Sequence, residues 1–295
     1  MKKIAFVTDT SSGLKNLEIP NVYVVPLNVL VTTYDDNNKA TTKSYQDQIE
    51  CTNQMICEWL KSDKKINIKT SQASLGEIQL IINQICDKYD EIYVIPIAST
   101  ASGSENSWRI IAQDEPKIHI VHQHMGGPML KWIIKDLISL SAEDNFDISV
   151  LNDYIKKSIN KIFGIMLVKD IKQLKNGGRV TKLTSLVLQK LNFSLLISLD
   201  EKGMKLFRVI KNFDKLSMLF FKYFNKKIQN FDDKAIEEIM FIRNTNEDKS
   251  LIDSYIQQVK NRFKQTDVKI TEEIMPAVLI AHAGLNSFIC AIKLK

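Results

Sequence analysis

The sequence predicts an α/β fold with two lobes, an N-terminal parallel-sheet domain in residues 1–150 and a C-terminal mixed-sheet α/β domain in residues 151–295. Three observations favour this architecture. The chain has 295 residues, which is long for one hydrophobic core and comfortable for two. Its first half alternates short apolar runs with helical patterns, as parallel sheets covered by helices do. Its second half contains a hairpin pattern, which indicates antiparallel pairing.

In the first half, apolar runs of strand length alternate with segments whose apolar residues recur at helical spacing. The expected strands are residues 4–8, 22–30, 66–70, 92–98 and 117–121. The expected helices are residues 45–61, 75–88, 105–113 and 128–140. Ligands of parallel sheets bind at the carboxyl ends of the strands, so the loops after these strands are the candidate site.

In the second half, the pattern changes after a polar, acidic connection at residues 141–149. A hairpin is expected from residues 193–199 and 204–210, with its turn at residues 200–203. Further strands are expected at residues 162–168, 236–243, 268–273, 278–281 and 288–294, a helix or turn at 169–176, and helices at 181–191 and before residue 264.

Composition and charge exclude several classes of protein. The net charge of 40 − 34 = +6 comes from bases spread along the chain, without a basic motif interleaved with aromatic residues, so we expect no nucleic-acid partner. No apolar run approaches the ~18 residues of a membrane span, and the apolar run near the start is too short for a signal peptide. We therefore expect a cytoplasmic protein. The four cysteines lack C-x-x-C spacing, which predicts reduced thiols and no zinc site.

Two loops rich in hydroxyl groups follow predicted strands. We call TSQAS (residues 70–74) the first hydroxyl loop and STASGS (residues 99–104) the second hydroxyl loop. If the two strands are neighbours, both loops direct hydroxyls and helix N-terminal amides toward one place, where a carboxylate or phosphate is stabilised. The first loop supplies the hydroxyls of Thr70, Ser71 and Ser74, and the second loop includes Ser102.

Helix initiation is the alternative explanation for both loops. Ser74 and Glu77 have the spacing of a capping box, and Ser102 and Glu105 have the same spacing. Serine and threonine are common at helix starts, so either loop alone favours this explanation.

Two further residues are candidates. His282 follows the expected strand 278–281 and precedes a turn of small residues, so its ring can project into a cleft. A structural histidine, fixed by one hydrogen bond, is the alternative. Arg179 follows Gly177 and Gly178, whose tight turn would direct it outward. A helix C-cap followed by a solvated arginine is the alternative there.

Metal and self-sufficient catalytic sites are not indicated. His122 and His124 are two residues apart on an expected strand and lack an obvious third ligand, so we expect no metal. The sequence contains none of the three tested motifs, the phosphate-binding G-x-x-x-x-G-K-[ST], the dinucleotide-binding G-x-G-x-x-G and the G-x-S-x-G nucleophile elbow.

Taken in order, several segments resemble the DegV family of bacterial fatty-acid-binding proteins over nearly the whole chain. These segments are VTDTSSGL, KTSQASLGE, IPIASTASGS, VKDIKQLKNGGRV, SLDEKG and AHAGLNSF. The resemblance implies a two-lobed α/β protein that holds one long-chain fatty acid between its lobes, in an apolar tunnel, without a cofactor. It also implies that Thr70, with Ser71 beside it, Ser102 and His282 hold the carboxylate. It implies that Arg179 serves the encounter with a fatty acid kinase subunit.

The chemistry of these residues agrees with that implication. Neutral donors hold a carboxylate in an apolar pocket without burying a second charge. Three positions depart from the DegV pattern: Ala73 replaces the usual proline, His122-Gln123 the usual Asp-Ser, and Leu285-Asn286 the usual Pro-Gly.

The sequence thus favours a lipid-binding, non-catalytic subunit of a fatty acid kinase system, and it leaves a transient membrane contact open. The alternative is a stand-alone acyl hydrolase or phosphotransferase, with Ser102 as nucleophile and His282 as base. No oxyanion-hole motif or third orienting acid supports that alternative. A DNA-associated regulator is suggested only by the net charge.

Overall fold

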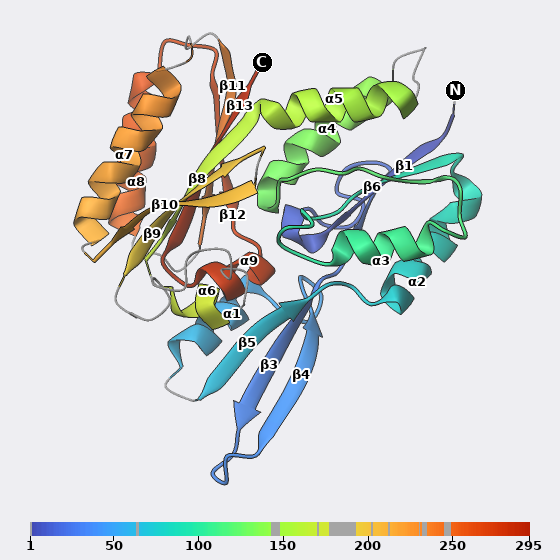
Figure 1. Cartoon of the computed structure of the whole chain (residues 1–295), viewed down its shortest axis with the longest axis horizontal. Coiled ribbons are helices and arrows are strands. Elements are labelled where there is room, and N and C mark those ends of the chain that lie inside the picture. The colour runs from blue at the N-terminus through green and yellow to red at the C-terminus, as the bar shows by residue number, and fades with distance from the viewer. Residues whose placement is uncertain are drawn as a thin grey trace. The chain divides into compact units, whose positions relative to one another are not determined.

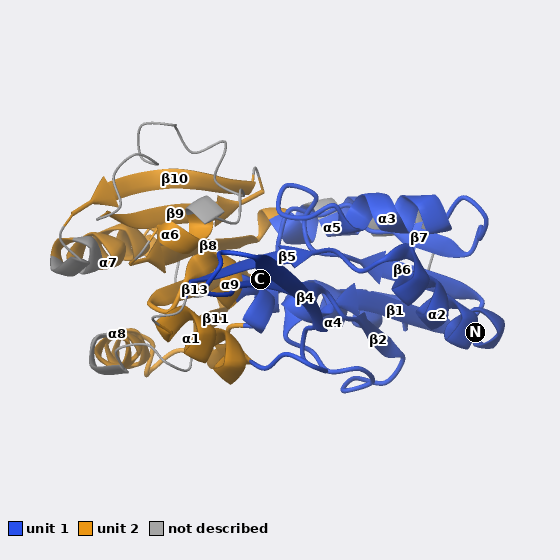
Figure 2. Cartoon of the chain, turned by 90° about the horizontal axis from the view of Figure 1, so that it is seen from below, with its two compact units in different colours: residues 1–52, 64–159, 276–279 blue, residues 53–63, 160–275, 280–295 orange. Residues whose placement is uncertain are grey.

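The computed structural model describes residues 2–62, 65–142, 148–169, 171–176, 193–201, 203–211, 213–229, 231, 235–244 and 249–295. The chain forms two units, which Figure 2 shows in different colours. Unit 1 comprises residues 1–52, 64–159 and 276–279, and unit 2 comprises residues 53–63, 160–275 and 280–295. Each unit contains a main sheet of its own (Figure 1).

The main sheet of unit 1 has four parallel strands in the order β2-β1-β6-β7, which confirms the predicted parallel sheet. The central strand β1 is buried along its whole length, as expected for a strand that is covered on both faces. The strands are β1 (Ile4–Asp9), β2 (Val22–Val25), β6 (Glu91–Ile95) and β7 (Ile118–Ile120).

Helices cover both faces of this sheet because alternate residues of β1 point to opposite sides. Ala5 and Val7 belong to an apolar cluster with residues of α2 and α3. Phe6, on the opposite face, lines a cavity together with Ile138 of α4. The helices and 3-10 turns of this region are η1 (Thr10–Ser12), α2 (Leu75–Ile85), η2 (Cys86–Lys88), α3 (Ser104–Ile111), η3 (Gly127–Met129), α4 (Leu130–Ser141) and α5 (Ile148–Asn160).

Unit 1 also contains a small antiparallel sheet that the sequence did not predict. Its order is β4-β3-β5 (Figure 1). The expected strand 66–70 is therefore confirmed as a strand but lies outside the parallel sheet. The strands are β3 (Asn28–Tyr34), β4 (Ala40–Gln46) and β5 (Ile66–Ser71).

Two predicted boundaries in this region are wrong. Residues 22–30 were expected to form one strand, but they form β2 and β3, which belong to different sheets. Pro26 lies between them and has no N–H with which to continue a ladder. The expected helix at 45–61 begins only at Asn53, as α1 (Asn53–Lys61) of unit 2, since its first residues complete β4.

Unit 2 contains a six-stranded mixed sheet in the order β10-β9-β8-β13-β11-β12. The predicted hairpin is confirmed, since β9 and β10 pair antiparallel with Asp200 opposite Gly203. Among the described strands of this sheet, β11 and β12 pair parallel and the other neighbours pair antiparallel. The strands are β8 (Ile162–Val168), β9 (Ser194–Asp200), β10 (Gly203–Ile210), β11 (Ile236–Arg243), β12 (Lys269–Ile274) and β13 (Ser287–Leu294).

The core of unit 2 lies between its sheet and two helices, α7 and α8 (Figure 1). Phe288 of β13 is 1% exposed, and its ring centroid lies 5.7 Å from that of Phe220 and 5.7 Å from that of Phe241. Aromatic rings at such distances add attraction beyond the burial of their area. The helices are α6 (Lys172–Asn176), α7 (Phe213–Gln229) and α8 (Lys249–Arg262).

Residues 278–281, which the sequence predicted as a strand, are helical. They lie in α9 (Ala277–Ala283), which ends where Gly284 adopts a positive φ of 79°. Short apolar runs have no periodicity that separates a strand from a buried helix. The helix expected at residues 181–191 lies outside the described residues. None of the helices in the described ranges is long and apolar enough to cross a lipid bilayer.

Candidate functional site

The first hydroxyl loop is fixed at its end by a capping box, as predicted. The Ser74 hydroxyl accepts the N–H of Glu77 at 3.2 Å, and the Glu77 carboxylate accepts the N–H of Ser74 at 2.6 Å. Asn28 and Gln46 also donate to this carboxylate, at 3.1 and 2.7 Å. Burial alone would raise the pKa of Glu77, but these hydrogen bonds outweigh it and lower the pKa. The carboxylate therefore ties the loop to β3 and β4.

Thr70 and Ser71 project from opposite faces of β5, because successive residues of a strand alternate. Thr70 is on the face of Ile68, which is 2% exposed, and it is paired with Val29, which is fully buried. Ser71 is on the face of the exposed Lys69. Thr70 is therefore the hydroxyl on the apolar side of the strand.

The second hydroxyl loop does not form the capping box that the sequence suggested. Helix α3 begins at Ser104, and its N-cap is Gly103, without a capping side chain. The Ser102 hydroxyl instead accepts the N–H of Ser104 at 3.2 Å and lies 2.9 Å from the Ser104 hydroxyl oxygen. The Ser102 side chain thus belongs to a local turn at the start of the helix, and it remains partly exposed.

The two hydroxyl loops meet at Gln72, a residue that the sequence analysis missed. The Gln72 side-chain amide donates to the Ser107 hydroxyl of α3 at 2.7 Å. Gln72 therefore joins the first hydroxyl loop to α3 within unit 1, although β5 belongs to the antiparallel sheet.

Asp9 connects the second hydroxyl loop to the end of β1. Its carboxylate accepts the N–H of Ser11 at 3.0 Å and the N–H of Ile97 at 2.7 Å, and it also accepts the Ser11 hydroxyl. The side chain is almost fully buried. Burial raises the pKa of Asp9 above its usual value of 3.8, although the three hydrogen bonds act in the opposite direction.

Asp47 is a second buried carboxyl group in unit 1. The residue is fully buried, and neither carboxyl oxygen has a hydrogen-bond partner of regular geometry in the described part of the chain. Burial, together with a smaller effect of the charge of Asp9, raises its pKa from 3.8 to about 7. The Thr10 hydroxyl and the amides of Gln48 and Val278 lie close enough to oppose this rise in pKa, without forming regular hydrogen bonds.

The two remaining candidates are His282, for carboxylate binding, and Arg179, for the encounter with a kinase subunit. His282 is partly exposed in the last turn of α9 and belongs to unit 2, whereas the hydroxyl loops belong to unit 1. A histidine in a last helical turn is favourably placed toward the negative end of the helix dipole. Arg179, with Gly177 and Gly178, lies outside the described residues.

His122 and His124 have structural contacts that explain them without a metal. The His122 ring nitrogen lies 3.1 Å from the carboxylate of Glu105, and the two histidine rings are 5.0 Å apart in an edge-on arrangement. Arg109 pairs with the same carboxylate. Burial opposes ionisation, but these partners lower the pKa of Glu105 overall. No group of three or more metal-binding side chains occurs among the residues described.

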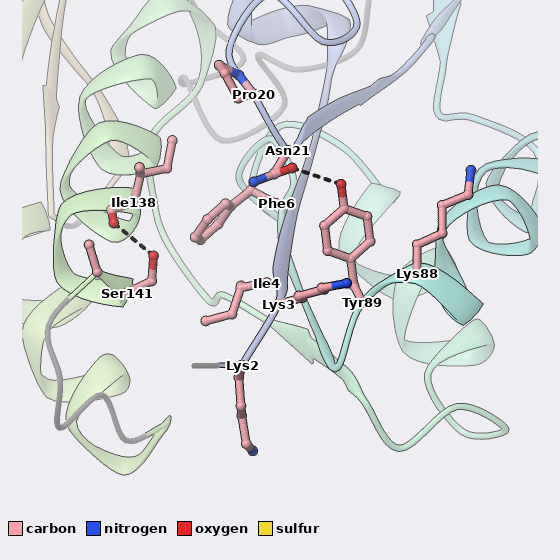
Figure 3. A pocket seen from close by; sticks show the side chains of 11 residues that line it. Lys2, Lys3, Ile4, Phe6, Pro20, Asn21, Lys88, Tyr89, Ile138 and Ser141 are labelled. Atoms are coloured by element: carbon pink, nitrogen blue, oxygen red, sulfur yellow. Dashed lines mark hydrogen bonds between the residues drawn. The ribbon is translucent and has the colours of Figure 1, made fainter.

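A cavity of about 550 Å³ lies in unit 1 at the amino ends of β1 and β6 (Figure 3). Phe6 and Ile138 line it, and the Tyr89 hydroxyl at its rim donates to the side-chain oxygen of Asn21 at 2.9 Å. The second hydroxyl loop follows the carboxyl end of β6. The cavity is therefore at the opposite end of the parallel strands from the candidate site.

The family of the chain follows from comparison with known proteins. The family model described as "Uncharacterised protein, DegV family" matches residues 3–293. This chain belongs to the DegV family. A DegV domain-containing protein of Mycoplasma genitalium is 27% identical over 293 residues, which cover 97% of this chain and 97% of that protein. One from Staphylococcus aureus is 23% identical, over 96% of each chain.

Solved DegV structures share the fold of this chain. A fatty-acid-binding DegV protein from Thermus thermophilus superposes with a TM-score of 0.80 at 19% identity, over 99% of this chain and 100% of the other. The fatty-acid-binding DegV of Bacillus subtilis gives 0.80 at 17% identity, with the same coverage. The Streptococcus pneumoniae Fatty Acid Kinase (Fak) B3 protein, loaded with linoleic acid, gives 0.74 at 16% identity, again with the same coverage.

Ala73 and Gln123, two of the residues that depart from the DegV pattern, have local structural roles. Ala73 is 5% exposed and packs in the apolar cluster beneath α2 and α3. Gln123 is 1% exposed, and its side chain donates to the carbonyl of Pro96 and accepts the N–H of Met125. It therefore joins the loop after β7 to the loop after β6. In unit 2, the carbonyl of Asn286 accepts the N–H of Lys169 at 3.1 Å.

Replacing Asp47 by asparagine should stabilise this DegV protein at neutral and alkaline pH. The folded state holds the Asp47 proton up to a pKa of about 7, whereas an unfolded aspartate releases it near 3.8. The stability of the parent should therefore fall as pH rises from about 4 to about 7, and then level off. Asp47→Asn removes this pH-dependent loss of stability. The free energy of unfolding of the variant should exceed that of the parent by on the order of 4 kcal/mol at pH 8, since each pKa unit corresponds to about 1.4 kcal/mol.

Urea unfolding of both proteins between pH 4 and pH 8 measures this difference. The control is Asp36→Asn, an exposed carboxylate in a turn, which should change the free energy of unfolding by less than about 0.5 kcal/mol. An Asp47→Asn protein that is no more stable than the parent at pH 8 would contradict the buried, protonated carboxyl group.

Proposed function

We propose that this DegV protein binds a long-chain fatty acid and presents its carboxylate to a partner kinase subunit for acyl-phosphate formation. The observation that carries the proposal is the hydrogen bond from Gln72 of the first hydroxyl loop to Ser107 of α3, the helix that follows the second hydroxyl loop. The match of the whole chain to fatty-acid-binding DegV structures supports it.

The donor set suits an anionic headgroup that must remain reactive. Thr70 and Ser102 offer neutral hydroxyl donors, and His282 is proposed as a third donor from unit 2. A lysine or arginine in their place would form a tight ion pair and hold the oxygen that must attack the phosphoryl group. Hydroxyls stabilise the carboxylate less strongly, so the headgroup can be both carried and modified.

The contacts of Ser102 favour this role over that of a nucleophile. An activated serine needs a base within hydrogen-bond reach. Within the described residues, the partners of the Ser102 hydroxyl are the hydroxyl and the amide of Ser104, neither of which is a base. We therefore expect no esterase activity from the purified chain.

The purified protein should carry a fatty acid of roughly sixteen to eighteen carbons. Burial of ~15 methylene groups at ~0.8 kcal/mol each gives a gross driving force of ~12 kcal/mol before the cost of association, enough for the ligand to survive purification. Denaturation, organic extraction and mass spectrometry measure the acyl content. An extract without a stoichiometric acyl chain, even after the protein has been loaded with free acid, would exclude the proposal.

Thr70→Val and Ser102→Ala should each weaken fatty-acid binding by about 1.5–3 kcal/mol, because each removes a donor to a buried carboxylate. Valine keeps the shape of threonine, so the strand should persist. Thr33→Val is the matched control, since Thr33 is an exposed threonine of β3 in the same sheet, and it should cost less than about 0.5 kcal/mol. Titration with a fluorescent fatty acid measures all three affinities. If Thr70→Val and Ser102→Ala bind like the parent, the hydroxyls serve only the local structure.

Arg179→Ala should separate binding from the kinase reaction. An arginine presented by the turn after Gly178 meets an acidic or phosphate-bearing surface better than a lysine does. The variant should keep fatty-acid affinity within about twofold, well below the tenfold that 1.4 kcal/mol represents. It should lose most acyl-phosphate formation with the kinase subunit and ATP.

Fatty-acid affinity and acyl-phosphate formation are measured on one preparation of the Arg179 variant. Arg208→Ala is the control for the removal of an arginine from unit 2. Arg208 lies on β10 with its guanidinium 4.9 Å from the ring centroid of Phe207. Equal losses of binding and of acyl-phosphate formation in Arg179→Ala would place Arg179 at the headgroup instead of at the partner surface.

A further inference from the structure

We propose that Gln72 is a positioning residue that sets the spacing between the two hydroxyl loops, and that this spacing makes the headgroup site selective for a carboxylate. The inference rests on the proposed fatty-acid binding. It concerns a residue that need not touch the ligand. The contacts on both ends of the Gln72 side-chain amide carry it.

The nitrogen end of the amide is anchored to α3. It donates to the Ser107 hydroxyl at 2.7 Å, and Ser107 is 5% exposed, so water competes little for this hydrogen bond. Ser107 lies in the first turn of α3, the helix that follows the second hydroxyl loop. Gln72 itself lies directly after β5, between Thr70 and the helix cap Ser74. One hydrogen bond therefore joins the backbone segments that carry Thr70 and Ser102.

The oxygen end of the amide lies against Gly103. A Cβ atom at position 103 would lie 2.1 Å from the side-chain oxygen of Gln72, which is far inside van der Waals contact. Gly103 has a φ of −80°, a conformation that any residue adopts, so the backbone does not require a glycine there. A side chain at position 103 would therefore have to displace the end of the Gln72 side chain. Gly103 of the second loop thus leaves room for the side-chain amide of Gln72 from the first loop.

The contact of the Gln72 nitrogen with Ser107 and that of its oxygen with Gly103 constrain the same distance. It is the distance between Thr70 on the first loop and Ser102 on the second. A carboxylate that is held by neutral donors gains from them only when both donors reach it together, since hydrogen bonds weaken steeply with poor geometry. Loss of the Gln72 contact should therefore lower the affinity for the headgroup and leave the affinity for the acyl chain unchanged.

The test compares a long-chain fatty acid with the alcohol of the same chain length. Gln72→Met keeps the length of the side chain and removes the hydrogen bond, Ser107→Ala removes its acceptor, and Gly103→Ala pushes the amide away. Each should weaken binding of the acid by at least about fivefold, close to the loss of one good hydrogen bond, and binding of the alcohol by less than about twofold. The combined Gln72→Met, Ser107→Ala protein should lose no more than either single variant.

Gln79→Met is the matched control, since Gln79 also donates through its side-chain amide, to Asn83 at 2.9 Å, on the exposed side of α2. It should leave the binding of both ligands unchanged. Thermal unfolding of every variant checks that the fold persists. Gly103→Ala and Ser107→Ala test the same contact without changing Gln72, so a folding defect of Gln72→Met alone does not affect them.

Three results would overturn the positioning role. Equal losses for acid and alcohol would make Gln72 a general structural residue. A loss in Gln72→Met without one in Ser107→Ala would mean that Gln72 contacts the ligand directly. Additive losses in the combined protein would mean that the two residues act separately. A parent protein that binds no fatty acid overturns the proposed function itself, and this is seen before any variant is measured.

Discussion

At the carboxyl end of β1, one buried carboxylate connects the loop after β1 to the loop after β6. Asp9 accepts hydrogen bonds from Ser11 and from the amide of Ile97, which lies two residues before the second hydroxyl loop. Burying a carboxyl group is costly unless its oxygens are satisfied, and hydrogen bonds to a charged acceptor contribute about 1.5–3 kcal/mol each. The position of the second hydroxyl loop therefore depends on these hydrogen bonds. Breaking them would leave a buried carboxyl group without partners, so they hold the loop firmly in place.

The charge of this region constrains what it can bind. A second carboxyl group, Asp47, lies near Asp9, and its raised pKa of about 7 keeps it largely protonated in weakly acidic and partly so in neutral solution. Two ionised carboxylates would repel an anionic headgroup as well as each other, so protonation of one of them favours the proposed ligand. The same logic explains why hydroxyls, and not cations, are the proposed donors. A cation close to Asp9 and Asp47 would be drawn to them instead of to the fatty acid.

The sequence predicted those elements whose apolar residues show a clear pattern. Strand β1, the hairpin of β9 and β10, strand β11 and the capping box at Ser74 are all in place. Strand β4 was missed because most of its residues are exposed and it lacks apolar alternation. The error at residues 278–281 has the opposite cause. Four apolar residues without polar interruption fit a strand and a buried helix equally well, and only the tertiary structure decides between them.

The candidate site was predictable where local signals exist. Hydroxyl residues after strands and before helices were visible in the sequence, and the DegV segments pointed to the same residues. The residues that hold these loops in place were not visible, since their partners are distant in the chain. Gln72 contacts Ser107, and Asp9 contacts Ile97, with no spacing rule to connect them.

This difference separates two kinds of residue in the candidate site. Thr70 and Ser102 are ordinary in sequence, and either one alone is explained by its strand or turn. As the proposed donors, they would act together only if contacts such as that of Gln72 with Ser107 set their spacing. A substitution at Gly103 or Gln72 should therefore resemble a headgroup mutation although neither residue supplies a proposed donor. Because geometry decides whether two neutral donors can replace one charge, the residues that position Thr70 and Ser102 bear on the ligand preference proposed for this chain.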